Sequence, residues 1–135
     1  MQKSYSFSFD LGTFPTTIYV LFGFAELEEA IDHFGLISDT LEYNDDDEDS
    51  LAFTIFERRT GNCYLLFKDK VLDISDLQLI VHEINHAVYY ILNYYDTDIN
   101  EQTTEVSAYM TDFIFKKITQ FLQKKQGMKL TIKKE

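Results

Sequence analysis

The sequence predicts an α+β protein, in which a small antiparallel sheet of two hairpins and one short helix precedes two long helices packed antiparallel. Before residue 70, aromatic and β-branched residues alternate with polar ones in short segments. Over residues 75–95 and 101–126, apolar residues recur every three or four positions. The chain has 135 residues, of which 45% are hydrophobic, enough for one folded core. We therefore expect a single domain over residues 1–135.

The first hairpin is predicted near the N-terminus. Residues 4–9 alternate serine with tyrosine or phenylalanine, which is typical of a strand with one aromatic face. Gly12 and Pro15 indicate a turn, and residues 16–22 are rich in β-branched and aromatic residues. Because the two segments are close in sequence, we expect them to pair with each other.

The middle of the chain predicts a short helix and the second hairpin. Residues 25–34 carry apolar residues at helical spacing, and Gly35 follows as a C-cap. Residues 44–50, with the sequence NDDDEDS, lack the glycine and glutamate positions of an EF-hand loop, so we expect a solvated loop. Residues 51–57 alternate between two faces, and a glycine-containing turn connects them to a second strand at residues 63–68, so we expect these two strands to pair.

Two long helices are predicted in the second half. The first extends from Ser75 to Tyr95, and Ser75 with Gln78 matches the capping box that starts a helix. The second covers residues 101–126, and its expected apolar stripe is Val106, Tyr109, Met110, Phe113, Ile114, Ile118, Phe121 and Leu122. Because the linker over residues 96–100 is short, we expect the helices to be antiparallel neighbours.

The first long helix contains the motif HExxH, with His82, Glu83 and His86. Residues four apart lie on the same face of a helix, so the two imidazoles can bind one Zn²⁺. Glu83 lies one position from His82 and can accept a proton from a water that the zinc activates. The motif therefore predicts a metal site.

A catalytic zinc site needs a third protein ligand. If the two long helices fold back about Asp98, the residues opposite His86 lie near position 110. Glu105 is at the edge of the predicted stripe and is our first choice. Asp112 and Glu101 remain alternatives from this geometry alone.

The sequence HEINH at 82–86, followed by EVSAY at 105–109, resembles the gluzincins. In those zinc peptidases, an HExxH helix supplies two histidines and the base, and a glutamate on a later helix completes the site. The chain is most similar to small zincin-like metallopeptidases encoded by bacteriophages, in which an E-x-x-A-Y segment follows HExxH. The resemblance covers roughly the second half of the chain.

The resemblance implies that His82, His86 and Glu105 hold Zn²⁺ and that Glu83 is the general base. Tyr109 stands where thermolysin-like members have an aspartate, four residues after the ligand glutamate. By position, Tyr109 is our candidate for stabilising the oxyanion. The predicted activity is hydrolysis of a peptide bond in a peptide or protein substrate.

The other candidates for the oxyanion role are Tyr89, Tyr90 and, if its helix reaches the cleft, His33. We expect His33 to be a surface histidine at a helix end. An edge strand at residues 51–57 or 63–68 would align the substrate by main-chain pairing.

Two alternative functions remain open from the sequence. One is a non-catalytic interaction protein stabilised by zinc, because the short chain leaves little material for a specificity subdomain. The other is a zinc amidase acting on cell-wall peptides, whose metal site would have the same residues.

Composition restricts partners and compartment. The net charge of −11 opposes binding to nucleic acid. The N-terminus lacks a signal-peptide pattern and no apolar run reaches membrane-span length, so we expect a cytoplasmic protein, in the host cytoplasm if a phage encodes it.

Cys63 is the one cysteine, and we expect it in the core. The one cluster of basic residues is near the C-terminus, and we expect it either to place cations at the C-terminal end of a helix or to form a tail that contacts a partner: Lys116, Lys117, Lys124, Lys125, Lys129, Lys133 and Lys134.

Overall fold

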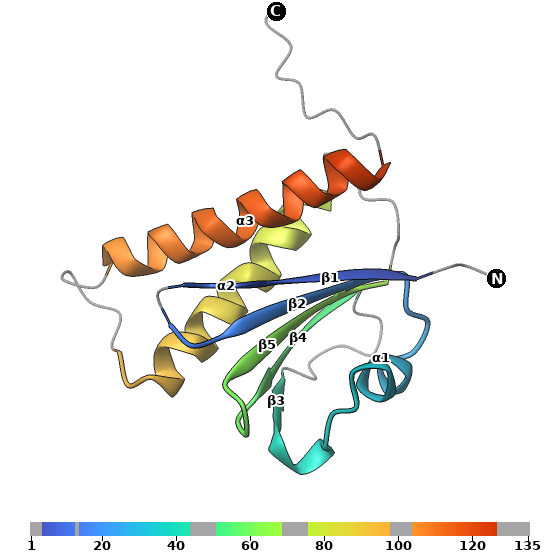
Figure 1. The fold of residues 1–135 in the computed structure, drawn as a ribbon, viewed down its shortest axis with the longest axis horizontal. Helices are drawn as coiled ribbons and strands as arrows, with labels where there is room; N and C mark the ends of the chain where they lie inside the picture. The colour runs from blue at the N-terminus through green and yellow to red at the C-terminus, as the bar shows by residue number, and fades with distance from the viewer. Residues whose placement is uncertain (1–3, 13, 44–50, 69–75, 98–103, 127–135) are drawn as a thin grey trace, which may run out of the picture.

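The computed structural model describes residues 4–12, 14–43, 51–68, 76–97 and 104–126. A five-stranded sheet separates one short helix from two long ones (Figure 1). In chain order the elements are β1 (Tyr5–Asp10), β2 (Thr17–Phe22), α1 (Leu27–Phe34), a 3₁₀ turn (Ser38–Thr40), β3 (Leu41–Tyr43), β4 (Ala52–Glu57), β5 (Asn62–Phe67), α2 (Leu77–Tyr94) and α3 (Thr104–Gln126). The predicted α+β class is confirmed.

The sheet is mixed, with the strand order β1-β2-β5-β4-β3. Both predicted hairpins are present, as the antiparallel pairs β1–β2 and β4–β5. The expectation of a purely antiparallel sheet is wrong, because β2 and β5 pair in parallel and so join the hairpins. The central strands β4 and β5 are buried along nearly their whole length, as expected for strands covered on both faces.

β3 was not predicted. It has only three residues, too few to show an alternating pattern, and it pairs antiparallel with β4. Its position makes it one edge of the sheet, with β1 at the other. The expectation that residues 51–57 or 63–68 form an edge strand is therefore wrong, since β4 and β5 are both interior strands.

Each face of the sheet has its own hydrophobic core. Inward-facing residues of β2, β4 and β5, such as Val20, Phe56 and Leu65, pack with α2 and α3. On the opposite face, Ile55 and Leu66 belong to the smaller core that α1 covers. As predicted, the apolar stripe of α1 packs on the sheet, and Gly35 caps the C-terminal end of the helix in a left-handed conformation, with φ 65°.

The helices α2 and α3 run in opposite directions and cross obliquely on one face of the sheet, as Figure 1 shows. α2 begins at Leu77, and its N-cap residue Asp76 makes no side-chain capping hydrogen bond. The predicted cap Ser75 lies outside the described residues, as do Glu101 and the acidic run over residues 44–50. None of the helices in the described ranges is long and apolar enough to cross a membrane.

The predicted stripe of α3 is correct for Met110, Ile114, Ile118 and Leu122, which are buried. It is wrong for Tyr109, whose exposed fraction is 73%, and Val106 is also exposed. Four residues are slightly more than one turn of a helix, so each successive residue at this spacing lies a little further around the helix axis. The stripe is therefore buried along most of α3, and its N-terminal end is turned away from α2 and the sheet.

Two tyrosines fix the C-terminal end of α2 to the turns between strands. The Tyr94 hydroxyl donates to the carbonyl of Arg58 at 3.0 Å, and the Tyr95 hydroxyl donates to that of Pro15 at 2.9 Å. Gly61 lies against both rings, because a Cβ atom there would be 2.9 Å from the Tyr95 hydroxyl oxygen. These contacts set the position of α2 beneath the sheet.

Candidate metal centre

His82 and His86 form the centre of the candidate site. Their Nε2 atoms are 3.1 Å apart, and their ring planes are nearly perpendicular, at 86°. Two nitrogen ligands of a tetrahedral zinc, each about 2.0–2.1 Å from the ion, are about 3.3 Å apart. The pair therefore has the spacing that one metal ion needs, and the same distance suits an N–H···N hydrogen bond between the rings.

The histidines lie on the open side of α2. His82 is exposed and His86 is half-buried. The buried face of the helix is formed by other residues: Ile80, Glu83, Ile84, Ala87, Val88, Ile91 and Leu92. An ion or a small substrate can therefore reach both imidazoles from solvent.

Glu83 occupies a different environment from its two neighbours in the motif. It is only 5% exposed, and its Oε1 accepts a hydrogen bond from the Thr54 hydroxyl, with 2.8 Å between the two oxygen atoms. The Thr54 hydroxyl also lies 3.0 Å from the backbone carbonyl of Glu83. The side chain of Glu83 thus points toward β4, into the interface between α2 and the sheet.

Cys63 is close enough to Glu83 for their charges to interact. Burial raises the pKa of the Cys63 thiol to about 12, and the negative charge of Glu83 contributes in the same direction. The thiol is fully buried in the core between the sheet and α2, as predicted. Such a thiol remains protonated at neutral pH and is a poor nucleophile.

The predicted third ligand does not join the histidines in this structure. Glu105 and Asp112 are both exposed on α3. Within the described ranges, no three His, Cys, Asp or Glu side chains are grouped so that they could hold a metal ion. Because α2 and α3 pack through their apolar stripes, the histidines and Glu105 lie on the solvent-facing arcs of their own helices.

The tyrosine candidates are dispersed. Tyr109 lines a hollow whose other described lining residues, Leu11, Val106, Met110 and Phe113, include none from α2. Tyr89 is 59% exposed, and Tyr90 is half-buried beside Phe56, with ring centroids 6.0 Å apart. His33 is exposed in the last turn of α1, as predicted.

Thr54 is the one residue of this site that the sequence analysis did not select. It is a hydroxyl residue at an inward-facing position of the apolar strand β4, and it is only 4% exposed. A buried hydroxyl needs a hydrogen-bond partner, so a threonine within such a strand was the available signal. The partner itself could not be read from the sequence, because Thr54 and Glu83 are 29 residues apart.

Comparisons of the chain with protein-family models, with curated proteins and with solved structures found no match.

Proposed function

We propose that the protein is a zinc-dependent metallopeptidase that hydrolyses a peptide bond in a peptide or protein substrate in the cytoplasm. The observation that supports this proposal best is the 3.1 Å separation of the His82 and His86 Nε2 atoms on the open face of α2. Two convergent imidazoles at helical spacing, one exposed and one half-buried, are suited to bind a divalent transition metal.

The residues fit zinc in part. His82 and His86 provide two nitrogen donors, and Glu105 is the proposed third ligand, which requires α3 to bring its N-terminal end closer to the pair. Zinc, when bound, acts as a Lewis acid that polarises a carbonyl and lowers the pKa of water.

Glu83 is the proposed base. It accepts the proton of the attacking water and passes it to the leaving amine. To do so its carboxylate must rotate from Thr54 toward the histidines, and three side-chain torsions make that movement available. Tyr109 stays the predicted oxyanion-stabilising residue, which again requires α3 to shift.

A second candidate is a non-catalytic interaction protein that zinc stabilises. The burial of Glu83 against Thr54 favours this function, because a carboxylate fixed in the core serves packing rather than proton transfer. In that case the histidine pair binds zinc and no peptide is cleaved.

The first experiment measures zinc content after dialysis of the wild-type chain, H82A, H86A and E105Q. We expect about one zinc per chain for the wild type and a marked loss in all three variants. H33A is the matched control, since His33 is an exposed helical histidine outside the pair, and it should retain the metal. Wild-type protein that takes up no zinc from excess would contradict both candidate functions.

The second experiment separates the two candidates. Zinc-loaded wild type and E83Q are incubated with a peptide library, and the products are identified by mass spectrometry. A peptidase gives cleavage that E83Q loses while it keeps its zinc. If the zinc-loaded wild type cleaves no peptide in the library, the result contradicts the peptidase and favours the interaction protein.

A further inference from the structure

One end of α3 and the β1–β2 loop form an apolar hollow, of which the proposed function uses only Tyr109. Its described lining residues are Leu11, Val106, Tyr109, Met110 and Phe113, and its volume is about 240 Å³. The Phe113 ring packs against that of Phe9 in β1, with ring centroids 5.9 Å apart. The hollow is large enough for one apolar side chain of a ligand.

A second, more open hollow of about 530 Å³ continues along α3. Its described lining residues are Tyr109, Asp112, Phe113, Lys116, Lys117 and Gln120. Because Tyr109 and Phe113 line both hollows, the two are adjacent and form one groove, which we call the α3 groove. The groove is apolar at one end, and at the other end its charged lining residues are Lys116, Lys117 and Asp112.

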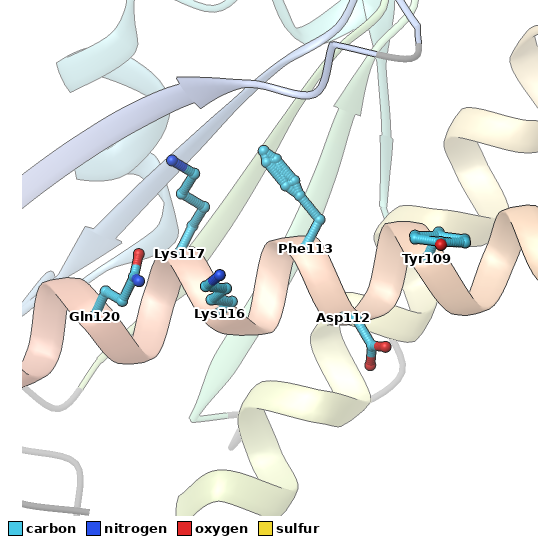
Figure 2. A pocket seen from close by; sticks show the side chains of 6 residues that line it. All are labelled: Tyr109, Asp112, Phe113, Lys116, Lys117 and Gln120. Atoms are coloured by element: carbon cyan, nitrogen blue, oxygen red, sulfur yellow. The ribbon is translucent and has the colours of Figure 1, made fainter.

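The lysines of the α3 groove are available to a ligand. Figure 2 shows Lys117 and Phe113 projecting to the same side of α3, whereas Asp112 points to the opposite side. The Lys117 Nζ lies 5.4 Å from the centroid of the Phe113 ring. Among the described residues the salt bridges are Arg58–Glu42 and Arg59–Glu57, so Lys116 and Lys117 have no acidic partner there.

We propose that the α3 groove binds an acidic peptide segment of a partner protein. An apolar side chain of the segment occupies the hollow beside Leu11, and carboxylates contact Lys116 and Lys117. Lys116 and Lys117, for which the described part of the chain supplies no acidic partner, are the basis for choosing an acidic segment, since the chain carries a net charge of −11 and otherwise repels acidic ligands.

The geometry of the groove also gives the spacing within that segment. Met110 and Lys117 are seven residues apart, which is about 10 Å along a helix axis. An extended peptide advances about 3.3 Å per residue. The acidic residues therefore lie about three positions from the apolar anchor.

The test uses a fluorescein-labelled peptide with one phenylalanine placed three residues from a pair of glutamates. The full chain is titrated into it, and binding is followed by fluorescence anisotropy. We expect saturable binding with a Kd below about 100 µM, weakened as salt is raised from 50 to 300 mM. A peptide with lysines in place of the glutamates should not bind.

K116Q/K117Q should weaken binding about fivefold to tenfold, as two lost surface ion pairs predict. K68Q/K124Q is the matched control, because it removes the same charge outside the lining residues, and its affinity should stay within about twofold of wild type. V106S should weaken binding about threefold through the apolar end. Far-UV circular dichroism and the melting temperature show that each variant is folded.

Three results would overturn the proposal. They are no saturable binding of the glutamate peptide, equal losses in K116Q/K117Q and K68Q/K124Q, and binding of the lysine peptide as tight as that of the glutamate peptide. None of these measurements depends on zinc or on peptidase activity.

Discussion

The Thr54 hydroxyl donates to the Glu83 carboxylate at 2.8 Å, across the buried interface between β4 and α2. This contact joins a motif residue of the helix to the centre of the sheet. Glu83 is only 5% exposed, and a buried carboxylate needs such a hydrogen-bond donor to offset the cost of its burial.

T54V should destabilise the fold by about 1–3 kcal/mol, because it leaves the buried Glu83 without its donor at nearly unchanged side-chain volume. Denaturant unfolding measures the change. T119V is the matched control, since the Thr119 hydroxyl donates only to carbonyls of its own helix, at 3.0 Å from that of Phe115. Equal stability of T54V and wild type would show that the contact contributes nothing.

Alkaline pH should destabilise the protein partly through Cys63. Its pKa is raised from about 9 to about 12 by burial, so the unfolded chain loses the thiol proton first as pH rises. The contribution of Cys63 to the free energy of unfolding is complete below pH 9. Above pH 9 it decreases, by about 1.4 kcal/mol per pH unit. C63A should therefore show a shallower decline in the free energy of unfolding between pH 9 and 10. Identical slopes in the two proteins would contradict this assignment.

G61A should destabilise the protein more than G12A. Both glycines have positive φ, 76° and 83°, so alanine strains the backbone at either position. At Gly61 the new Cβ also meets the Tyr95 hydroxyl at 2.9 Å and the Tyr94 ring at 3.1 Å, whereas at Gly12 nothing lies within 4 Å in the part of the chain that the structure describes. We expect an additional cost of about 1–3 kcal/mol for G61A, measured by denaturant unfolding.

Zinc should raise the melting temperature of the wild-type chain. A ligand at one hundred times its Kd stabilises the folded state by about 2.7 kcal/mol. The doubly substituted H82A/H86A should melt at the same temperature with and without zinc, whereas H33A should respond as the wild type does. Differential scanning calorimetry at equal protein concentrations makes the comparison, and a zinc response retained by H82A/H86A would place the metal elsewhere.

Local periodicity was sufficient to predict most elements. The spacing of apolar residues predicted α1, α2 and α3. Alternation in residues 4–9 and 51–57, β-branched and aromatic residues in 16–22, and the glycine-containing turns predicted both hairpins. It also brought His82 and His86 together, because one helical turn separates them regardless of what surrounds the helix.

The tertiary structure alone decided the relations between elements distant in sequence. The parallel pairing of β2 with β5 and the addition of β3 at the sheet edge depend on which strands can be buried together, and no local pattern encodes that choice. The same holds for Glu83. The motif predicts that its side chain lies beside the histidines, whereas in the structure it is hydrogen-bonded to Thr54 of the sheet. The sequence by itself thus determined a helix with two convergent imidazoles, whereas long-range packing decided which carboxylates face them and which face the core.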